Sequence, residues 1–330
     1  MKNLQNFQKL FDIAIFQYLR KKEAQLSQID SDASVLIRIL TEFIKNGGKR
    51  IRPALFYYAS VSYGGDKEDA LMRSMAFELF QTFCLIHDDL IDKSDLRRGK
   101  PTVHTKYGQA TAILSGDMAM MIADEVFLKF ESSERVKKTY NIFKQEVILG
   151  EYLESIGSKD TQKVMDLKTA RYSFVRPVEL AFFILNRDQQ LINIWKKVLH
   201  EIGMIFQLKD DLMGVFGKKE SIGKSTTSDL QEGKYTQLIE FFDTKASSSK
   251  KQQFYHVFKQ GHLSEKDSHL LRNMLKEENV PEKMIDKISK KNFVIKQDLK
   301  KIHEVPLHHI LYDILAGIED MSVIALETPL

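Results

Sequence analysis

Apolar residues recur at three- and four-residue intervals almost to the C-terminus, and short polar loops separate the runs. This period places the apolar side chains on one face of a helix. Only 16 glycines and 6 prolines occur in 330 residues, well below the roughly 12% of average usage. Because many short strands would need far more turn residues, the chain is predicted to be all-α.

We expect helices over most of the chain. The predicted ranges are 3–27, 32–45, 52–63, 67–93, 106–130, 134–156, 160–185, 188–215, 234–244, 248–260, 264–277, 281–301 and 307–325. The one long irregular stretch, from Gly217 to Tyr235, is predicted to be a mobile flap, since so long a loop inside a helical domain is functional or disordered. With neither a linker nor a repeat of roughly 30–45 residues, a single domain over residues 1–330 is predicted.

Charge and composition exclude several classes of protein. Lysine and arginine exceed aspartate and glutamate by only 4, which does not indicate a nucleic-acid partner. One cysteine, Cys84, excludes an internal disulfide framework and a Cys-rich zinc site. No apolar run approaches the roughly 18 residues that cross a bilayer, and the N-terminal segment has helical apolar spacing rather than a signal peptide's apolar core. We expect a cytoplasmic protein with no transmembrane segment.

The densest chemical signal is the segment FQTFCLIHDDLIDKSDLRRGKPTVH, residues 80–104. Asp88 and Asp92 are four residues apart and share a helix face, where like charges repel unless a cation accompanies them. Carboxylates without thiolates or clustered imidazoles select hard cations such as Mg²⁺, usually shared with phosphate. Arg97 and Arg98 follow, and arginine matches phosphate oxygens bidentately. The segment predicts a polyphosphate clamp, although a solvated acidic patch would show the same spacing.

A second acidic pair lies in FQLKDDLMGVFG, residues 206–217. Gln207 precedes Asp210 and Asp211 by three and four residues, so the amide and the acids share a helix face. If the two Asp pairs face one another, metal ions can bridge them through a shared diphosphate.

A third cluster is GGKRIRP, residues 47–53. Lys49, Arg50 and Arg52 stand at an expected helix start, with Pro53 at its first position, where free N–H groups favour anions. A plain basic loop is an equally good interpretation of this segment by itself.

Six segments, in this order, resemble the trans-prenyltransferases, the head-to-tail isoprenyl diphosphate synthases. They are GGKRIRP at 47–53, DDLID at 88–92, LRRGKPTVH at 96–104, KTA at 168–170, FQLKDD at 206–211, and GKSTTSD through EGK at 223–234. The resemblance covers roughly residues 40–240. It implies an all-α isoprenoid synthase fold, a single large helical bundle around a central cavity, and a homodimer formed through helices near 106–130.

The resemblance also implies a reaction. An allylic diphosphate (dimethylallyl, geranyl or farnesyl) ionises with the help of Mg²⁺, and the double bond of isopentenyl diphosphate attacks the carbocation. Loss of a proton, taken by the departing pyrophosphate, completes one five-carbon extension. Positive charge concentrated at the leaving group in a dry site promotes the ionisation.

Residue roles follow from the resemblance alone. Asp88 and Asp92 would ligate two Mg²⁺ ions and Asp210 a third. The catalytic residues would be Lys168, Thr169 and Gln207. The allylic diphosphate would contact Arg97, Lys168, Thr169, Gln207, Lys224 and Lys234. Isopentenyl diphosphate would contact Lys49, Arg52, Gln81 and Arg98. Gln81 fits independently, because it lies seven residues, about two helical turns, before Asp88.

Product length and two departures from the family pattern complete the expectation. In the family that the chain resembles, a bulky residue four or five positions before the first acidic motif limits product length, so the small Cys84 and the aromatic Phe83 at these positions imply a twenty-carbon geranylgeranyl product. A farnesyl or longer-chain product is the alternative. Gly214 replaces a frequent third aspartate of the second motif, and Lys218 stands where an aspartate is common. Both leave the strength of third-metal binding open.

Three other functions are considered. His87-Asp88 is similar to the His-Asp pair of metal-dependent phosphohydrolases, but no further histidines form a recognisable site, so His87 is interpreted as a packing residue. A terpene cyclase would not need an isopentenyl diphosphate site. A catalytically silent interaction subunit would usually lose acidic motif residues, and both Asp pairs persist.

Overall fold

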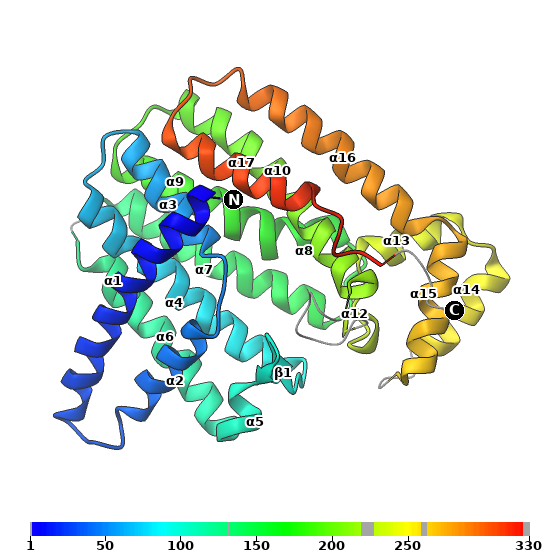
Figure 1. The fold of residues 1–330 in the computed structure, drawn as a ribbon, viewed down its shortest axis with the longest axis horizontal. Coiled ribbons are helices and arrows are strands. Elements are labelled where there is room, and N and C mark those ends of the chain that lie inside the picture. Colours follow the sequence, from blue (N-terminus) through cyan, green and yellow to red (C-terminus); the bar gives the residue numbers. More distant parts are fainter. Residues whose placement is uncertain (1, 131, 219–227, 259–262, 326–330) are drawn as a thin grey trace. The chain divides into compact units, whose positions relative to one another are not determined.

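The computed structural model describes residues 2–130, 132–218, 228–258 and 263–325. It is 79% helical. Within the described stretches the only strands are the two-residue β1 (Leu96–Arg97) and β2 (Lys100–Pro101), which pair antiparallel in a hairpin (Figure 1). The predicted all-α class is confirmed.

The chain falls into two compact units, each assembled from separate stretches. Unit 1 contains Met1–Thr139, Pro177–Ile192 and Val305–Asp313. Unit 2 contains Tyr140–Arg176, Asn193–Glu304 and Ile314–Leu330. The single domain over residues 1–330, and the cavity at its centre, stay predictions.

The helices follow the predicted periodicity closely. Those of unit 1 are α1 (Lys2–Ser27), α2 (Val35–Lys45), α3 (Ile51–Ser62), α4 (Lys67–Ile91), α5 (Val103–Tyr107) and α6 (Gln109–Leu128). Those of unit 2 are α8 (Thr161–Met165), the π-helix η1 (Asp166–Val175), α12 (Ser228–Gln231), α13 (Gln237–Lys245), α14 (Ser248–Phe258), α15 (Glu265–Glu277) and α16 (Val280–Leu299). Four helices are divided between the units: α7 (Glu134–Ser155), α9 (Arg176–Ile184), α10 (Gln189–Phe216) and α17 (Pro306–Glu319).

Unit 1 is built around α4, which packs against α3 and α6. Phe56, Phe77 and Phe127, one from each of these three helices, are fully buried with ring centroids 5.0 to 6.3 Å apart. Helix α1 buries a stripe at the predicted three- and four-residue spacing, so the N-terminal segment is amphipathic as expected.

Three predicted helix ranges need correction. The range 106–130 contains the end of α5 and all of α6, because Gly108, with φ of +87°, breaks the helix with a backbone conformation that L-residues rarely adopt. The range 160–185 is interrupted by η1, and 307–325 ends early, at Glu319. Pro53 lies at the third position of α3 rather than at its first.

No helix in the described part of the chain is long and apolar enough to span a membrane.

Candidate active site

The first acidic motif lies at the C-terminal end of α4, in unit 1. Asp88 and Asp92 are one turn apart, and the N–H of Asp92, the C-cap residue, donates to the Asp88 carbonyl at 2.8 Å. Both side chains are partly accessible, whereas Asp89 is only 1% exposed. This one-turn spacing at the end of α4 agrees with the helix face that the sequence predicted Asp88 and Asp92 to share.

The β1–β2 hairpin turns Arg97 back onto this motif. Arg97 Nε donates to both carboxylate oxygens of Asp89, at 2.7 and 2.8 Å, and Nη2 donates to Asp88 Oδ2 at 2.9 Å. Burial alone would lower the pKa of Arg97, but the carboxylates of Asp89 and Asp88 raise it. Arg97 thus neutralises a buried carboxylate, Asp89, and keeps one amino group on the predicted metal ligand Asp88.

The cluster GGKRIRP divides into structural and accessible cations. Arg50 is 3% exposed, has φ of +52°, and donates to Asp12 Oδ1 at 2.8 Å and to Glu78 Oε1 at 2.6 Å. It therefore fixes the loop to α1 and α4 and has no guanidinium surface to offer a ligand. Lys49 is exposed and Arg52 is half-buried, as residues that bind a ligand from solvent should be.

Arg98 lies against the same loop. Its Nη1 donates to the Gly47 carbonyl, and a Cβ added at Gly48 would meet Arg98 Nη2 at 3.1 Å. Burial, together with Arg97 and Arg50 nearby, lowers the pKa of Arg98 against the opposing effect of Glu78. A desolvated cation beside other cations is favourable for an anion. The structure thus brings together Arg98 and the loop of Lys49 and Arg52, three of the residues predicted to bind isopentenyl diphosphate.

The residues expected to set product length lie on α4 before the motif. Phe83 is 9% exposed, and its ring centroid lies 5.3 Å from that of Phe80 and 4.6 Å from that of His87. His87 packs so closely on α6 that a Cβ at Gly116 would overlap its ring. This placement agrees with the interpretation of His87 as a packing residue. Cys84 and Gln81 are half-buried on the same helix.

In unit 2, Lys168 and Thr169 lie on the π-helix η1. Two glycines allow η1 to pack closely against neighbouring helices. A Cβ at Gly150 of α7 would lie 2.7 Å from the Lys168 nitrogen, and a Cβ at Gly203 of α10 would lie 2.5 Å from Ala170 Cα. The backbone of residues 168–170 therefore rests directly on two helices. π-Helical segments are rare and frequently mark functional sites.

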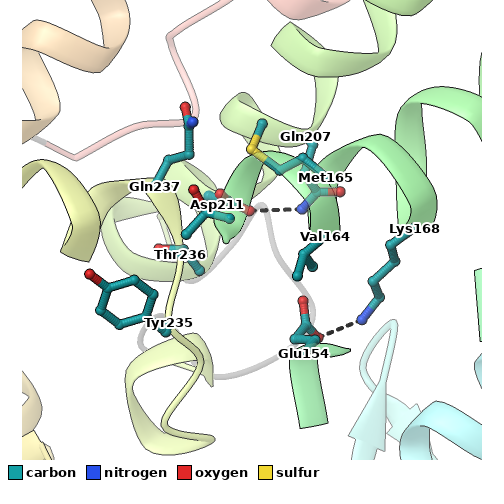
Figure 2. Close-up of a pocket in the computed structure, with 10 residues that line it drawn as sticks. Glu154, Val164, Met165, Lys168, Gln207, Asp211, Tyr235, Thr236 and Gln237 are labelled. Carbon is teal, nitrogen blue, oxygen red and sulfur yellow. Dashed lines mark hydrogen bonds and ion pairs between the residues drawn. The ribbon is translucent and has the colours of Figure 1, made fainter. Parts of the chain in front are cut away.

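A chain of hydrogen bonds links the predicted catalytic residues. The Thr169 hydroxyl donates to Gln207 Oε1. Gln207 Nε2 in turn donates to Asp211 Oδ1 at 2.7 Å, a bond that Figure 2 shows. Burial, with Asp229, Asp210 and Glu154 nearby, raises the pKa of Asp211 well above its usual range despite the bond from Gln207. Asp211 is buried, whereas Asp210 is exposed.

The two lysines expected to hold the allylic diphosphate share one carboxylate. Lys168 Nζ lies 2.5 Å from Glu154 Oε2 and 2.8 Å from Glu151 Oε2. Lys234 Nζ lies 3.6 Å from Glu154 Oε2 and 2.7 Å from Glu232 Oε2. Glu154, Lys168, Gln207 and Asp211 line a pocket of about 290 Å³, part of it open to solvent (Figure 2).

The departure at Gly214 has a structural explanation. A Cβ at this position would overlap the carboxylate of Asp229, which lies on α12, a short helix within the stretch that was predicted to be an irregular flap. Burial raises the pKa of Asp229 to about 7, partly opposed by Lys234 and reinforced by Glu232 and Asp210. Asp229 thus occupies the space that a side chain at position 214 would need.

Two flap residues complete the account of the predicted site. Lys224 lies outside the described residues. The backbone N–H of Lys218 donates to the Val323 carbonyl at 2.9 Å, and its side chain is exposed.

The donor chemistry fits Mg²⁺. Within the described stretches no group of three or more His, Cys, Asp or Glu side chains is arranged to hold a metal ion. Mg²⁺, however, is usually bound by one or two carboxylates together with substrate phosphates and waters. Asp88 and Asp92, two carboxylates one turn apart, match that requirement, and Asp210 supplies an accessible carboxylate in unit 2.

Several acidic residues of these clusters were not predicted from the sequence. They are Glu151, Glu154, Asp229 and Glu232. Single acids on an amphipathic helix look like surface residues, so Glu151 and Glu154 gave no signal. Asp229 and Glu232 lie within the block that ends in EGK, and their closeness to Lys234 in sequence could have indicated them.

Comparisons with known proteins identify the family of this chain. The polyprenyl synthetase family model matches residues 33–275. A geranylgeranyl diphosphate synthase from Sulfolobus acidocaldarius is 32% identical over 227 residues, 64% of this chain and 68% of that protein. A farnesyl diphosphate synthase from Micrococcus luteus is 32% identical over 229 residues, 65% of this chain and 78% of that protein.

Solved structures show the same similarity over nearly the whole chain. A geranylgeranyl pyrophosphate synthase from Corynebacterium glutamicum, complexed with isoprenyl diphosphate and magnesium, superposes with a TM-score of 0.85 at 28% identity. The match covers 96% of this chain and 99% of that one. The chain therefore belongs to the polyprenyl synthetase family and is a trans-prenyltransferase, a short-chain isoprenyl diphosphate synthase.

Proposed function

We propose that the enzyme condenses isopentenyl diphosphate head-to-tail with dimethylallyl, geranyl or farnesyl diphosphate, and that its main product is geranylgeranyl diphosphate. The observation that carries the proposal is the pair of cationic clusters, one in each unit, each beside an acidic motif. Arg98 and the loop of Lys49 and Arg52 adjoin the first motif. Lys168 lines the same pocket as Asp211 of the second motif, and Lys234 Nζ lies 3.6 Å from Glu154 of that pocket.

In unit 1, Lys49, Arg52, Gln81 and Arg98 would bind isopentenyl diphosphate. Arg98 supports this role because its guanidinium is desolvated beside other cations and gains from an anion. Arg50, buried and bound to Asp12 and Glu78, would keep the loop in shape.

Lys168, Lys234, Lys224 and Arg97 would bind the allylic diphosphate, as the family resemblance implies. Glu154 keeps the ammonium groups of Lys168 and Lys234 close together, so the cost of gathering two like charges is met before the substrate arrives. Thr169 and Gln207, aligned by the bond from Gln207 to Asp211, would direct oxygen atoms at the developing carbocation.

Asp88, Asp92 and Asp210 would hold three Mg²⁺ ions. When bound, Mg²⁺ neutralises charge that develops on the departing diphosphate. Arg97, which bonds both Asp88 and the buried Asp89, orients the first motif for this task. The departing pyrophosphate would take the proton that ends each cycle, so no protein base is assigned.

Geranylgeranyl diphosphate is favoured as the product because, in the family that the chain resembles, the residues four and five positions before the first motif would floor the product tunnel, and here these are the small Cys84 and the aromatic Phe83. Phe83 is anchored between the rings of Phe80 and His87 and is 9% exposed. Relatives include both geranylgeranyl and farnesyl synthases, so a fifteen-carbon product is the competing assignment.

We also propose a homodimer formed through α6. Leu114, Met121 and Leu128 recur at seven-residue intervals on this helix and are 56%, 65% and 47% exposed. Three large apolar residues in one row resemble the seam of a paired helix.

The activity is tested with labelled isopentenyl diphosphate, an allylic diphosphate and Mg²⁺, with and without EDTA. We expect Mg²⁺-dependent transfer of label into longer diphosphates, and loss of about a hundredfold or more in Asp88→Asn. Release of diphosphate without chain growth would indicate a phosphohydrolase, a cyclic hydrocarbon a cyclase, and no turnover a silent subunit. Each of these results would overturn the proposal.

A further inference from the structure

Three charged residues at five-residue intervals lie along η1 and its C-cap: Asp166, Arg171 and Arg176. On an α-helix, side chains three or four residues apart are neighbours. On a π-helix the backbone bonds join residues five apart. The Arg176 N–H indeed donates to the Arg171 carbonyl. The five-residue interval therefore puts all three side chains on one face only while the segment is π-helical.

These side chains form a continuous network with α7 and α10. Arg171 Nε lies 3.0 and 2.9 Å from the two Asp166 oxygens, and Arg171 Nη1 donates to Glu146 Oε1 at 2.9 Å. Arg176 donates to Glu146 from Nε at 2.7 Å and from Nη2 at 2.6 Å. His200 Nε2 lies 3.0 Å from Asp166 Oδ1. We call Asp166, Arg171, Arg176 and Glu146 the charged ladder.

The charged ladder is largely buried, so breaking its ion pairs should lower the free energy of unfolding. The side chain of Glu146 is 9% exposed and that of Arg176 14%, so the pair is largely removed from water. Against the effect of burial, Glu146 and Asp166 raise the pKa of Arg171, and His200 and Arg171 lower the pKa of Asp166. Breaking a buried pair leaves an uncompensated charge, which is strongly destabilising.

Straightening η1 into an α-helix would break the ladder. Residues 171 and 176 would then point to different sides of the helix, and only one guanidinium could reach Glu146. The same change would break the close packing of residues 168–170 against Gly150 and Gly203.

We propose that the charged ladder selects the π-helix over the α-helix and thereby positions Lys168 and Thr169. Its members are positioning residues that touch no substrate. The inference relies on the proposed function for what Lys168 and Thr169 bind, but its structural half, selection of the π-helix, does not.

The test compares Glu146→Gln, Arg176→Gln and the conservative Arg176→Lys with wild type. Glu278→Gln is the matched control, because Glu278 forms an ion pair with Lys250 at 2.6 Å, and neither residue belongs to η1 or contacts the ladder in an ion pair. Circular dichroism verifies that each variant is folded. Arg176→Lys keeps the charge but loses the two-pronged contact, so it should lie between wild type and Arg176→Gln.

Hydrogen exchange measures whether the π-helix is retained, and steady-state kinetics measures the effect on activity. Hydrogen exchange of the amides of residues 171–176 should accelerate by about tenfold or more in Glu146→Gln and Arg176→Gln, and stay unchanged in Glu278→Gln. The kcat/KM for the allylic primer should fall by about ten- to a hundredfold. The KM for isopentenyl diphosphate should change by less than about twofold, because its proposed residues lie elsewhere.

The outcomes distinguish failure of this inference from failure of the proposed function. Unchanged exchange in Glu146→Gln and Arg176→Gln would overturn selection of the π-helix. Accelerated exchange with an unaltered allylic kcat/KM would overturn the positioning role. Absence of condensation by the wild type would overturn the proposed function, while the exchange data would still decide on the ladder. If Glu146→Gln or Arg176→Gln unfolds fully, the hydrogen exchange and the allylic kcat/KM of the milder Arg176→Lys decide between these outcomes.

Discussion

Gly214 is the residue at which this chain lacks a frequent third aspartate, and Asp229 fills the vacated space. Restoring the aspartate should therefore harm the protein rather than improve it. We expect Gly214→Asp to lower the free energy of unfolding by about 1–3 kcal/mol through overpacking and carboxylate repulsion, measured by urea denaturation.

The matched control removes the competing side chain. The double variant Gly214→Asp/Asp229→Gly should regain most of the lost free energy of unfolding, because one carboxylate then replaces the other. Equal destabilisation in the single and double variants would contradict the proposed competition for space.

Asp229 also predicts a dependence of stability on pH. Its pKa of about 7 lies above the ordinary 3.8, so the folded protein retains a proton that the unfolded chain releases. Its contribution to stability is complete below pH 3.8 and is lost as the pH rises through about 7. In metal-free buffer, the free energy of unfolding of Asp229→Asn should rise relative to that of wild type by up to about 4 kcal/mol between pH 4 and 8. A pH-independent difference would contradict this.

Phe83 predicts a change of product. Phe83→Ala should lengthen the isoprenoid chain if Phe83, packed against Phe80 and His87, is the floor of the product site as proposed. Chromatography of the dephosphorylated products measures this. Phe80→Ala, at a fully buried position one turn away, should reduce stability without lengthening the product. An unchanged product distribution in Phe83→Ala would exclude Phe83 as the floor.

Helix α10 is tied to α17 by one lysine. Lys209 Nζ donates to the Gly317 carbonyl at 2.6 Å and to that of Asp320, so a buried cation caps the C-terminus of α17. Lys209→Met should lower the free energy of unfolding by about 1.5–3 kcal/mol in urea. Lys197→Met, on an exposed position of the same helix, should have almost no effect. Similar losses in both variants would refute the cap.

Most helices could be predicted from the sequence because their apolar spacing is a local property. The stripe of α1 and the long α4 and α10 illustrate this. The π-helix η1 could not be predicted, because contacts with Gly150, Gly203 and Glu146, distant in sequence, accompany its backbone geometry. The two-residue strands of the hairpin are likewise too short to show a period.

The charges of the site were predictable and their partners were not. Asp88, Lys168 and Gln207 are visible as motif residues, but the ion pairs of Arg97 with Asp89 and of Lys168 with Glu154 depend on tertiary packing. Arg50 shows the same limit: its sequence neighbours suggest an anion site, whereas its contacts with Asp12 and Glu78 are structural.

The molecule as a whole is predicted to be a dimer through the exposed apolar row of α6. Met121→Glu, at the centre of that row, should shift the protein toward the monomer by burying a charge in the proposed seam. Light scattering coupled to gel filtration measures the mass. Ile29→Glu, at an exposed apolar position outside α6, is the control. A wild-type monomer, or a Met121→Glu variant with an unchanged dimer mass, would contradict the assignment.

The most direct test of the enzyme's role is the chain length of its product. Purified protein is incubated with labelled isopentenyl diphosphate, Mg²⁺ and dimethylallyl, geranyl or farnesyl diphosphate in separate reactions, and the dephosphorylated products are separated by chromatography. We predict that all three primers lead mainly to the twenty-carbon alcohol. Accumulation of the fifteen-carbon product, with no extension of farnesyl diphosphate, would contradict the assignment as a geranylgeranyl diphosphate synthase.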